Sequence, residues 1–402
     1  MKLTMKNIGV IRDAEIELDG ITVLAGYNGT GKSTTSKALY GVIASYVNLE
    51  EKILEERTNS VLLIVMDFLM RAAKTLSIDR KLLNHITQVT SDFVTGACPI
   101  PEQYEDWVRL LPEYLKNGDS ESFPKFLEKL RTAVNRSNTE YVQYLADKTM
   151  KSVFDSQINT IHSPEPGEVS LTGTKNTRLA WMKITGNAIT ECSVQEIHVR
   201  KPIYLDTRHV LDRFSEPAYN SDLYTLLKES ASEPTFEEYK SREHVQELIA
   251  SVIHGRLTTS SFGNFTFTDD HFNEPVSLRN IASGNKTFAV LQRLIQNGAL
   301  RENTVLIIDE PENNQHPEWQ LKLAETLVLL HKELGVRLFL NTHSTYFLRA
   351  IEVYADKYEL SDHCHYYQTQ PADGAENLFY VRNVDGNTNL IYHDFYMPLE
   401  EL

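Results

Sequence analysis

The residues of this chain best suited to chemistry form one loop, Gly26–Ser33, with the sequence GYNGTGKS. The loop matches the pattern G-x-x-x-x-G-K-[ST] at every fixed position. Glycines let successive backbone N–H groups turn towards phosphate oxygens, and a following helix adds the positive end of its dipole. The pattern predicts that Lys32 reaches the β- and γ-phosphates of a nucleotide and that Ser33 holds Mg²⁺. The residues expected to bind the nucleotide are Asn28, Gly29, Thr30, Gly31, Lys32, Ser33 and Thr34.

The segments on either side of this loop have the character that phosphate binding requires. Residues 21–25, ITVLA, are an apolar run rich in β-branched residues, which predicts a buried strand. Residues 33–43 contain no glycine before Gly41 and predict a helix. The alternative is a chance glycine turn before a helix, and the strand–loop–helix context makes it the less favoured interpretation.

A second candidate lies where an apolar run, residues 305–308, ends in two carboxylates, Asp309 and Glu310. Catalytic groups of parallel α/β sheets collect at the carboxyl ends of strands. We expect Asp309 to face the magnesium ion through water and Glu310 to orient and polarise an attacking water. The alternative, an acidic turn after a core strand, is less favoured once the phosphate loop has been found.

Two weaker motifs accompany these. Ser283 and Gly284, in IASGNK, form a turn before an amphipathic segment, and helix N-termini bind anions. Alone, this turn is better explained as an ordinary helix cap. His343 follows the strand predicted at residues 336–340 and could reach a phosphate, although a lone histidine there is more often structural.

Together, the four motifs resemble in order and character those of ATP-binding-cassette ATPases. LIIDEPENNQHPEWQ is similar to the D-E-P-E-x-x-L-H-P segment of the RecF/SMC/OLD-like branch (OLD denotes overcoming lysogenisation defect), and NTHSTYFL to its T-H-S-P-Y-F-L. IASGNK stands where the family has its signature motif. The resemblance covers residues 1–40 and about 165–355, and it implies an α/β fold. That fold is a P-loop ABC-type ATPase head with an antiparallel β lobe and a helical insertion.

The resemblance also implies an arrangement of the site. Two heads would close face to face around two ATP molecules, giving a homodimer or a higher even oligomer. Ser283 and Gly284 of one head would contact the γ-phosphate bound by the other, and Asn313 and Asn314 would lie on the loop that crosses between heads. His343 would contact the γ-phosphate and the water. The implied cofactors are ATP and Mg²⁺, with catalysis by Lys32, Glu310 and His343 and metal binding by Ser33 and Asp309.

The chain departs from the family pattern at three positions. Gln315 replaces a usual leucine, Thr345 a usual proline, and Asn285 a frequent glycine. These departures concern dimer contacts more than the core chemistry. The magnesium-sensing glutamine of the family has no clear counterpart, and Gln157 is only a weak candidate.

Composition narrows the class of protein. The chain has 402 residues, of which 41% are hydrophobic and 24% charged, as in soluble globular proteins. Its net charge of −15 disfavours binding nucleic acid through the overall field but leaves local basic patches possible.

Cys98, Cys192 and Cys364 form no C-x-x-C pair, which indicates neither a zinc site nor a disulfide framework. No signal peptide and no apolar run of about 18 residues is visible, so we expect a cytoplasmic protein without a membrane partner.

The wider pattern predicts a head that is interrupted by an insertion. We expect the head at 1–45 and 156–402 and a helical insertion at 46–155, where apolar residues recur at helical spacing. Residues 2–18 alternate and predict two antiparallel strands joined near Arg12 and Asp13.

Further along, residues 166–206 have strand character, and 209–257 predict a smaller helical element. Residues 262–267 predict a short hairpin strand. The C-terminal stretch 366–395 predicts two or three strands that cap the head.

Several functions are compatible with these motifs. We favour the ATPase sensor or regulator subunit of a bacterial antiphage defence system that controls a separately encoded effector. The alternative is an SMC- or RecF-like DNA clamp or DNA-repair ATPase, for which DNA would be the partner. A transporter motor fits less well, because such ATPases are usually shorter and lack so large an insertion. About 55 residues follow the helix after His343, too few for the Toprim nuclease domain of OLD proteins at ordinary domain sizes.

Overall fold

The computed structural model describes residues 1–72, 80–111, 115, 122–173, 177–195, 198–206, 218–229, 236–259, 265–271, 274–277, 280–374 and 377–400. The chain divides into two compact units. The sheet unit comprises Met1–Val47 and Ala146–Leu402, and the helical unit comprises Asn48–Leu145.

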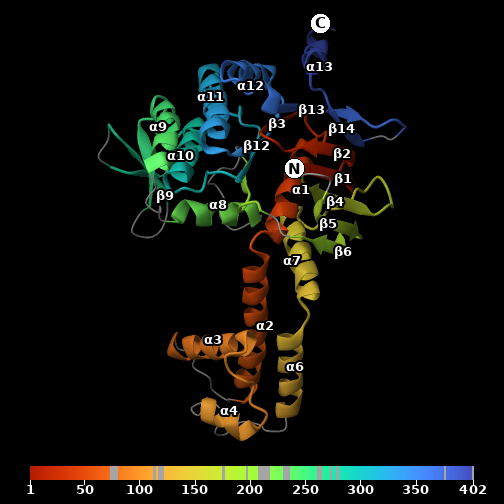
Figure 1. The fold of residues 1–402 in the computed structure, drawn as a ribbon, viewed down its shortest axis with the longest axis vertical. Coiled ribbons are helices and arrows are strands. Elements are labelled where there is room, and N and C mark those ends of the chain that lie inside the picture. Colours follow the sequence, from red (N-terminus) through yellow and green to blue (C-terminus); the bar gives the residue numbers. More distant parts are fainter. Residues whose placement is uncertain are drawn as a thin grey trace. The chain divides into compact units, whose positions relative to one another are not determined.

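The described part of the sheet unit is built on one eleven-stranded sheet (Figure 1). Its order is β6-β5-β4-β1-β2-β14-β13-β3-β12-β11-β7. Strands β13, β3, β12, β11 and β7 run parallel to one another, whereas β2, β1, β4, β5 and β6 form an antiparallel region. The strands are β1 (Lys2–Ile8), β2 (Ile11–Glu17), β3 (Ile21–Ala25), β4 (Gly167–Thr172), β5 (Arg178–Thr185), β6 (Ala188–Val194), β7 (Ile203–Asp206), β11 (Val305–Asp309), β12 (Arg337–Thr342), β13 (Cys364–Pro371) and β14 (Phe379–Asn383).

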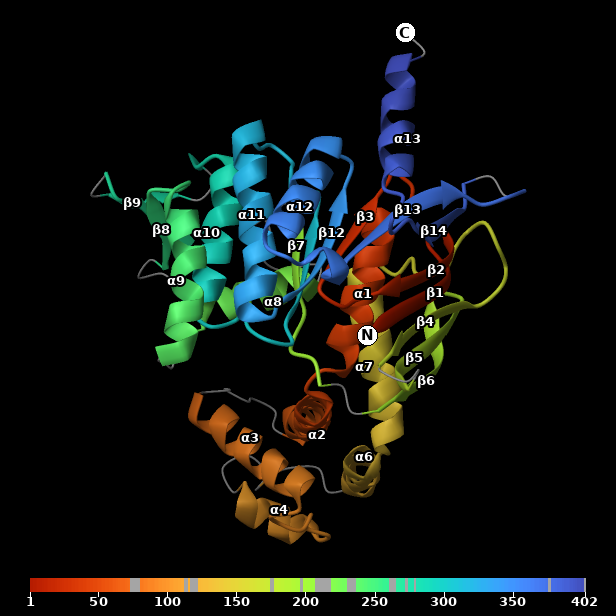
Figure 2. The ribbon, with the colours of Figure 1, turned by 45° about the horizontal axis from the view of Figure 1, so that its top comes forward.

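Helices cover the parallel strands. The helices of this unit are α1 (Lys32–Tyr46), α8 (Ala218–Lys228), α9 (Phe236–Ala250), α10 (Ser283–Gln296), α11 (Pro317–Leu334), α12 (Thr345–Lys357) and α13 (Asn389–Glu400), with a short 3₁₀ turn at Ser361–His363. A smaller antiparallel sheet contains β8 (Gly255–Thr259), β9 (Phe265–Asp269) and β10 (Val276–Ser277). Figure 2 shows α10, α11 and α12 grouped beside the parallel strands.

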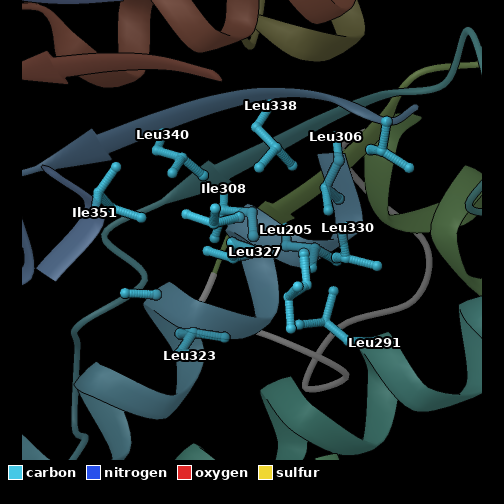
Figure 3. Close-up of a cluster of buried hydrophobic side chains, with 14 of the residues drawn as sticks. Leu205, Leu291, Leu306, Ile308, Leu323, Leu327, Leu330, Leu338, Leu340 and Ile351 are labelled. Atoms are coloured by element: carbon cyan, nitrogen blue, oxygen red, sulfur yellow. The ribbon is translucent and has the colours of Figure 1, made fainter. Parts of the chain in front are cut away.

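The main core explains why these segments adopt these elements. Every residue of β3 and β11 is buried, as expected for parallel strands covered on both faces. Leu306 and Ile308 of β11 point towards Leu323 and Leu327 of α11, and Leu291 of α10 lies in the same cluster (Figure 3). Side chains alternate along a strand and repeat every 3.6 residues along a helix, so β11 and α11 each place apolar side chains on the face that meets the other.

The helical unit has a core of its own. Its helices are α2 (Leu49–Ala72), α3 (Arg80–Thr95), α4 (Tyr104–Leu110) and α6 (Phe123–Asn135), and the unit boundary falls within α7 (Asn138–Val153). Phe68 and Phe126 stack with ring centroids 4.0 Å apart, and Trp107 packs edge-on against Phe126. The indole N–H of Trp107 donates to the Pro101 carbonyl oxygen at 2.9 Å, so the buried ring leaves no polar atom unpaired.

The fold class predicted from the sequence is confirmed, with two local corrections. The first strands are joined at Gly9 and Val10, and Arg12 and Asp13 instead lie inside β2. Gly9 adopts a φ of +53°, and a Cβ there would lie 2.9 Å from Thr34 Cγ2, so the turn falls at the residue that tolerates it.

The second correction concerns the C-terminal stretch. Strand β13 is inserted between β3 and β14 rather than capping the head, and residues 389–400 form α13. Ile391 is buried and Phe395 packs against the main core, a spacing of four residues that suits a helix.

Parts of the predicted stretches, residues 207–217, 230–235 and 260–264, lie outside the described residues. None of the helices within the described ranges is both long and apolar enough to cross a membrane.

Candidate nucleotide-binding site

The register of the parallel strands brings the predicted motifs to one edge of the sheet. Ala25, which ends β3, lies opposite Thr342, which ends β12. Asn341 lies opposite Asp309 at the end of β11. The phosphate loop, the two carboxylates and His343 therefore follow three neighbouring strand ends, the usual place for ligands in parallel sheets.

The phosphate loop borders a cavity of about 410 Å³. Gly29 and Gly31 have φ of +80° and +96°, and Gly31 directly precedes the first residue of α1. A Cβ at Gly31 would lie 2.3 Å from Ile11 Cδ1, so a side chain here would add a close contact to an already strained backbone. The residues that line the cavity are Val10, Asn28, Gly29, Gly31, Lys32, Ser33, Thr34 and Glu310.

Lys32 is held inside this loop by the loop itself. Its ammonium group donates to the carbonyl oxygens of Gly26 at 2.7 Å and Tyr27 at 2.9 Å. The side chain of Thr30 also donates to the Tyr27 carbonyl, at 2.8 Å. A nucleotide phosphate would offer the ammonium group a charged acceptor in place of neutral ones, and such bonds are stronger.

Asp309 lies behind the cavity in a network of hydrogen bonds. It is 2% exposed, and its Oδ1 accepts from the Asn341 side chain at 2.9 Å. Its Oδ2 accepts from the Tyr204 hydroxyl at 3.2 Å. Asn341 also donates to the Ser36 hydroxyl at 2.6 Å and so connects β11 with the first turns of α1. Burial, and then the nearby Asp309 carboxylate, raise the pKa of Tyr204 well above its ordinary value, so its hydroxyl remains a donor.

These groups fit a magnesium ion. Mg²⁺ prefers oxygen ligands and keeps several waters. Ser33 borders the cavity, whereas Asp309 is not among the lining residues, which suits contact through water. Tyr204 and Asn341 are two further residues that hold Asp309, and the sequence motifs predicted no role for either.

Glu310 borders the cavity in a strained backbone conformation. Its φ of +51° lies in the left-handed region, which non-glycine residues adopt at a cost and often at functional sites. The Asn313 side chain donates to Glu310 Oε2 at 2.7 Å. His343 Nδ1 lies 3.6 Å from Glu310 Oε1 and 3.6 Å from Glu312 Oε1. The structure therefore brings Glu310, Asn313 and His343 together.

The signature segment lies apart from this cavity. Ser283 begins α10, and Gly284 is not among the residues that line the cavity with the phosphate loop. A Cβ on Gly284 would lie 3.1 Å from the Trp319 ring and 3.7 Å from the Asn314 carbonyl oxygen. Gly284 therefore adjoins the loop after β11. Gln157 is exposed and is not a lining residue.

The C-terminal stretch contacts the phosphate loop, which the sequence did not indicate. The Thr369 hydroxyl of β13 donates to the Thr30 hydroxyl at 2.7 Å. The Tyr27 hydroxyl donates to the Asp394 carbonyl oxygen of α13, and the Tyr27 ring meets Phe395 edge-on at 5.6 Å. Residues 339 and 367 positions away thus help to fix the loop.

Replacing Tyr204 tests the network behind Asp309. Tyr204→Phe removes the donor to Oδ2 and should raise the Mg²⁺ concentration needed for half-maximal binding of a fluorescent ATP analogue about tenfold. Tyr141→Phe is the control, because it also removes a buried hydroxyl bond, to Ala133, but in the helical unit. An unchanged magnesium midpoint in Tyr204→Phe would contradict a role for this hydroxyl in metal binding.

Comparison with known proteins gives the family. The AAA ATPase domain family matches residues 1–348. No curated protein matches the chain. Among solved structures, an SMC head domain from Thermotoga maritima has 10% identity and a TM-score of 0.38, covering 95% of this chain and 98% of its own. An SmcHead bound to the C-winged helix domain of ScpA has 8% identity and a TM-score of 0.45, covering 96% and 97%. Since the family match extends from the first residue into α12, this chain belongs to the AAA ATPase domain family.

Proposed function

We propose that this protein binds ATP with Mg²⁺ and hydrolyses it. The observation that supports this most directly is the position of Glu310, which borders the same cavity as Lys32 and Ser33. A carboxylate opposite a phosphate loop can accept a proton from a water molecule that attacks the γ-phosphate. The backbone of Glu310 adopts a left-handed φ of +51°, a strained conformation that is often found at functional sites.

The other residues have supporting roles in this reaction. Lys32 would transfer its hydrogen bonds from the loop carbonyls to the β- and γ-phosphates. His343 would contact the γ-phosphate, and Asn313 would keep Glu310 oriented. Bound Mg²⁺ would neutralise developing charge on the phosphate oxygens, held by Ser33 directly and by Asp309 through water.

Glu310→Gln separates binding from turnover. The variant keeps the size of the side chain and one oxygen that can accept from Asn313 but loses the base, so hydrolysis should fall about 100- to 10,000-fold. Binding of a fluorescent ATP analogue should remain near that of the wild type, whereas Lys32→Ala should lose it. Turnover of the wild-type size in Glu310→Gln would remove this residue from the reaction.

We further propose that the complete site forms between two copies of the chain. Ser283 and Gly284 lie at the N-terminus of a fourteen-residue helix, a position suited to an anion, and Gly284 is not among the residues that line the cavity of its own chain. Gly284 adjoins Asn314, which belongs to the loop expected to cross between heads. A second copy would bring this surface to the phosphate that the first copy binds.

A mixing experiment tests the shared site. Ser283→Arg should bind ATP normally and fail to hydrolyse it, because its own phosphate loop is intact. Mixed with Lys32→Ala, it should regain activity, since one composite site per dimer then has both parts intact. The amount of phosphate released by each variant alone and by the equimolar mixture is measured. A mixture that stays inactive although both variants dimerise would contradict a site shared between chains.

We also propose that the protein is a sensor or regulator subunit of a bacterial antiphage defence system and controls a separately encoded effector. The helical unit supports a role in protein contacts, because it buries its own core and still exposes Leu63 by 69% and Met70 by 53%. These residues lie two turns apart on one face of α2. The net charge of −15 of the whole chain disfavours DNA binding through the overall field.

Charges placed on this face test the proposal. Leu63→Glu with Met70→Glu should abolish co-purification with the product of a neighbouring gene while ATP hydrolysis continues. Leu83→Glu on α3 is the control, because Leu83 is also exposed, by 41%, but on another helix. Undiminished co-purification with the double variant would exclude this face of α2 as the docking surface.

A further inference from the structure

Glu312 is a buried carboxylate that the reaction described above does not use. It follows Glu310 by two positions, is 6% exposed and lies beside His343. Its Oε2 is buried and has no hydrogen-bond partner among the described residues. A buried carboxylate with one unpaired oxygen is costly, so its retention calls for an explanation.

The other oxygen of Glu312 joins two loops of the site. Oε1 accepts from the Thr342 hydroxyl at 2.7 Å and from the backbone N–H of His343 at 2.9 Å. The same oxygen lies 3.6 Å from His343 Nδ1. One carboxylate from the loop after β11 therefore holds the main chain of the histidine that follows β12 and lies near its ring.

The loop that carries Glu312 needs such an anchor. Glu310 and Asn314 both adopt left-handed φ, at +51° and +56°, within five residues. Backbone strain of this kind persists only where the surrounding structure fixes it. The bond that Glu312 accepts from Thr342 is buried, the bond from His343 is partly buried, and together they tie this loop to the end of a central strand.

We infer that Glu312 is a positioning residue for hydrolysis. It keeps His343 beside Glu310 and couples the loop after β11 to the loop after β12. The inference rests on the proposed ATPase function. His343 Nδ1 lies 3.6 Å from a carboxylate oxygen of each residue, and the bond from the His343 backbone N–H to Glu312 fixes the main chain from which the ring extends beside Glu310. The loop also carries Asn313 and Asn314, so a contact made there by a second copy would reach His343 through Glu312.

The main test compares Glu312→Gln with Glu318→Gln. Glu318 carries the same charge six residues further on but is exposed. Glu312→Gln should keep binding of a fluorescent ATP analogue within about twofold and lower the single-turnover hydrolysis rate about tenfold, the size of one lost charge-assisted contact. Glu318→Gln should change neither quantity.

A double-mutant cycle with His343→Ala separates positioning from general stability. In the His343→Ala background, Glu312→Gln should lower the remaining rate by less than about twofold, because the residue through which it acts is gone. An undiminished tenfold loss in that background would overturn the inference. If Glu312→Gln unfolds under assay conditions, Thr342→Val, which removes one hydrogen bond to Glu312, enters the same cycle with the same criterion.

The outcomes also distinguish this inference from the function on which it rests. A wild-type chain that does not hydrolyse ATP would overturn both. A hydrolysing wild type whose Glu312→Gln and Thr342→Val variants are fully active would overturn the positioning role alone. A rate loss in both variants that disappears in the His343→Ala background would support it.

Discussion

The site depends on one constraint, the burial of a carboxylate at the end of an apolar strand. The apolar residues of β11 are fixed between two covered faces, and Asp309 must then be buried with them. A buried charge is tolerated only when hydrogen-bond donors surround it. Tyr204 from β7 and Asn341 from β12 supply those donors, and Asn341 extends the network to Ser36 of α1. The order of the strands and the place of the phosphate loop are therefore linked through a single side chain.

The local motifs were predictable because each is encoded in consecutive residues. The phosphate loop, Asp309, Glu310 and His343 can each be recognised from residue type and from the apolar run that precedes them. Tyr204 and Thr369 cannot be recognised in this way, because it is the order of the strands in the sheet that places them beside the site. Tyr204 lies on a strand far from Asp309 in sequence, and only the pairing of β7 with β11 brings them together. Likewise, Thr369 reaches Thr30 because β13 pairs with β3, which no periodicity could show.

The C-terminal stretch gives the clearest case of missed information. Its alternating residues predicted strands, and β13 and β14 are indeed strands. The apolar residues of α13 recur at helical spacing, but over so short a segment this spacing is hard to distinguish from the alternation of a strand. The helices of the helical unit were easier to predict from the sequence. Its spacing predicted helices, and the aromatic cluster around Trp107 and Phe126 explains how an insertion without a sheet buries its side chains.

The contact between Gly284 and Trp319 gives the protein an optical property. The chain has three tryptophans, and they lie in three different environments: Trp107 in the core of the helical unit, Trp181 on β5, and Trp319 at the start of α11. Indole emission depends on local polarity, and only the ring of Trp319 adjoins the signature turn among these described positions. Any event that changes the surroundings of that turn should alter the emission of this one fluorophore, without a dye or a label.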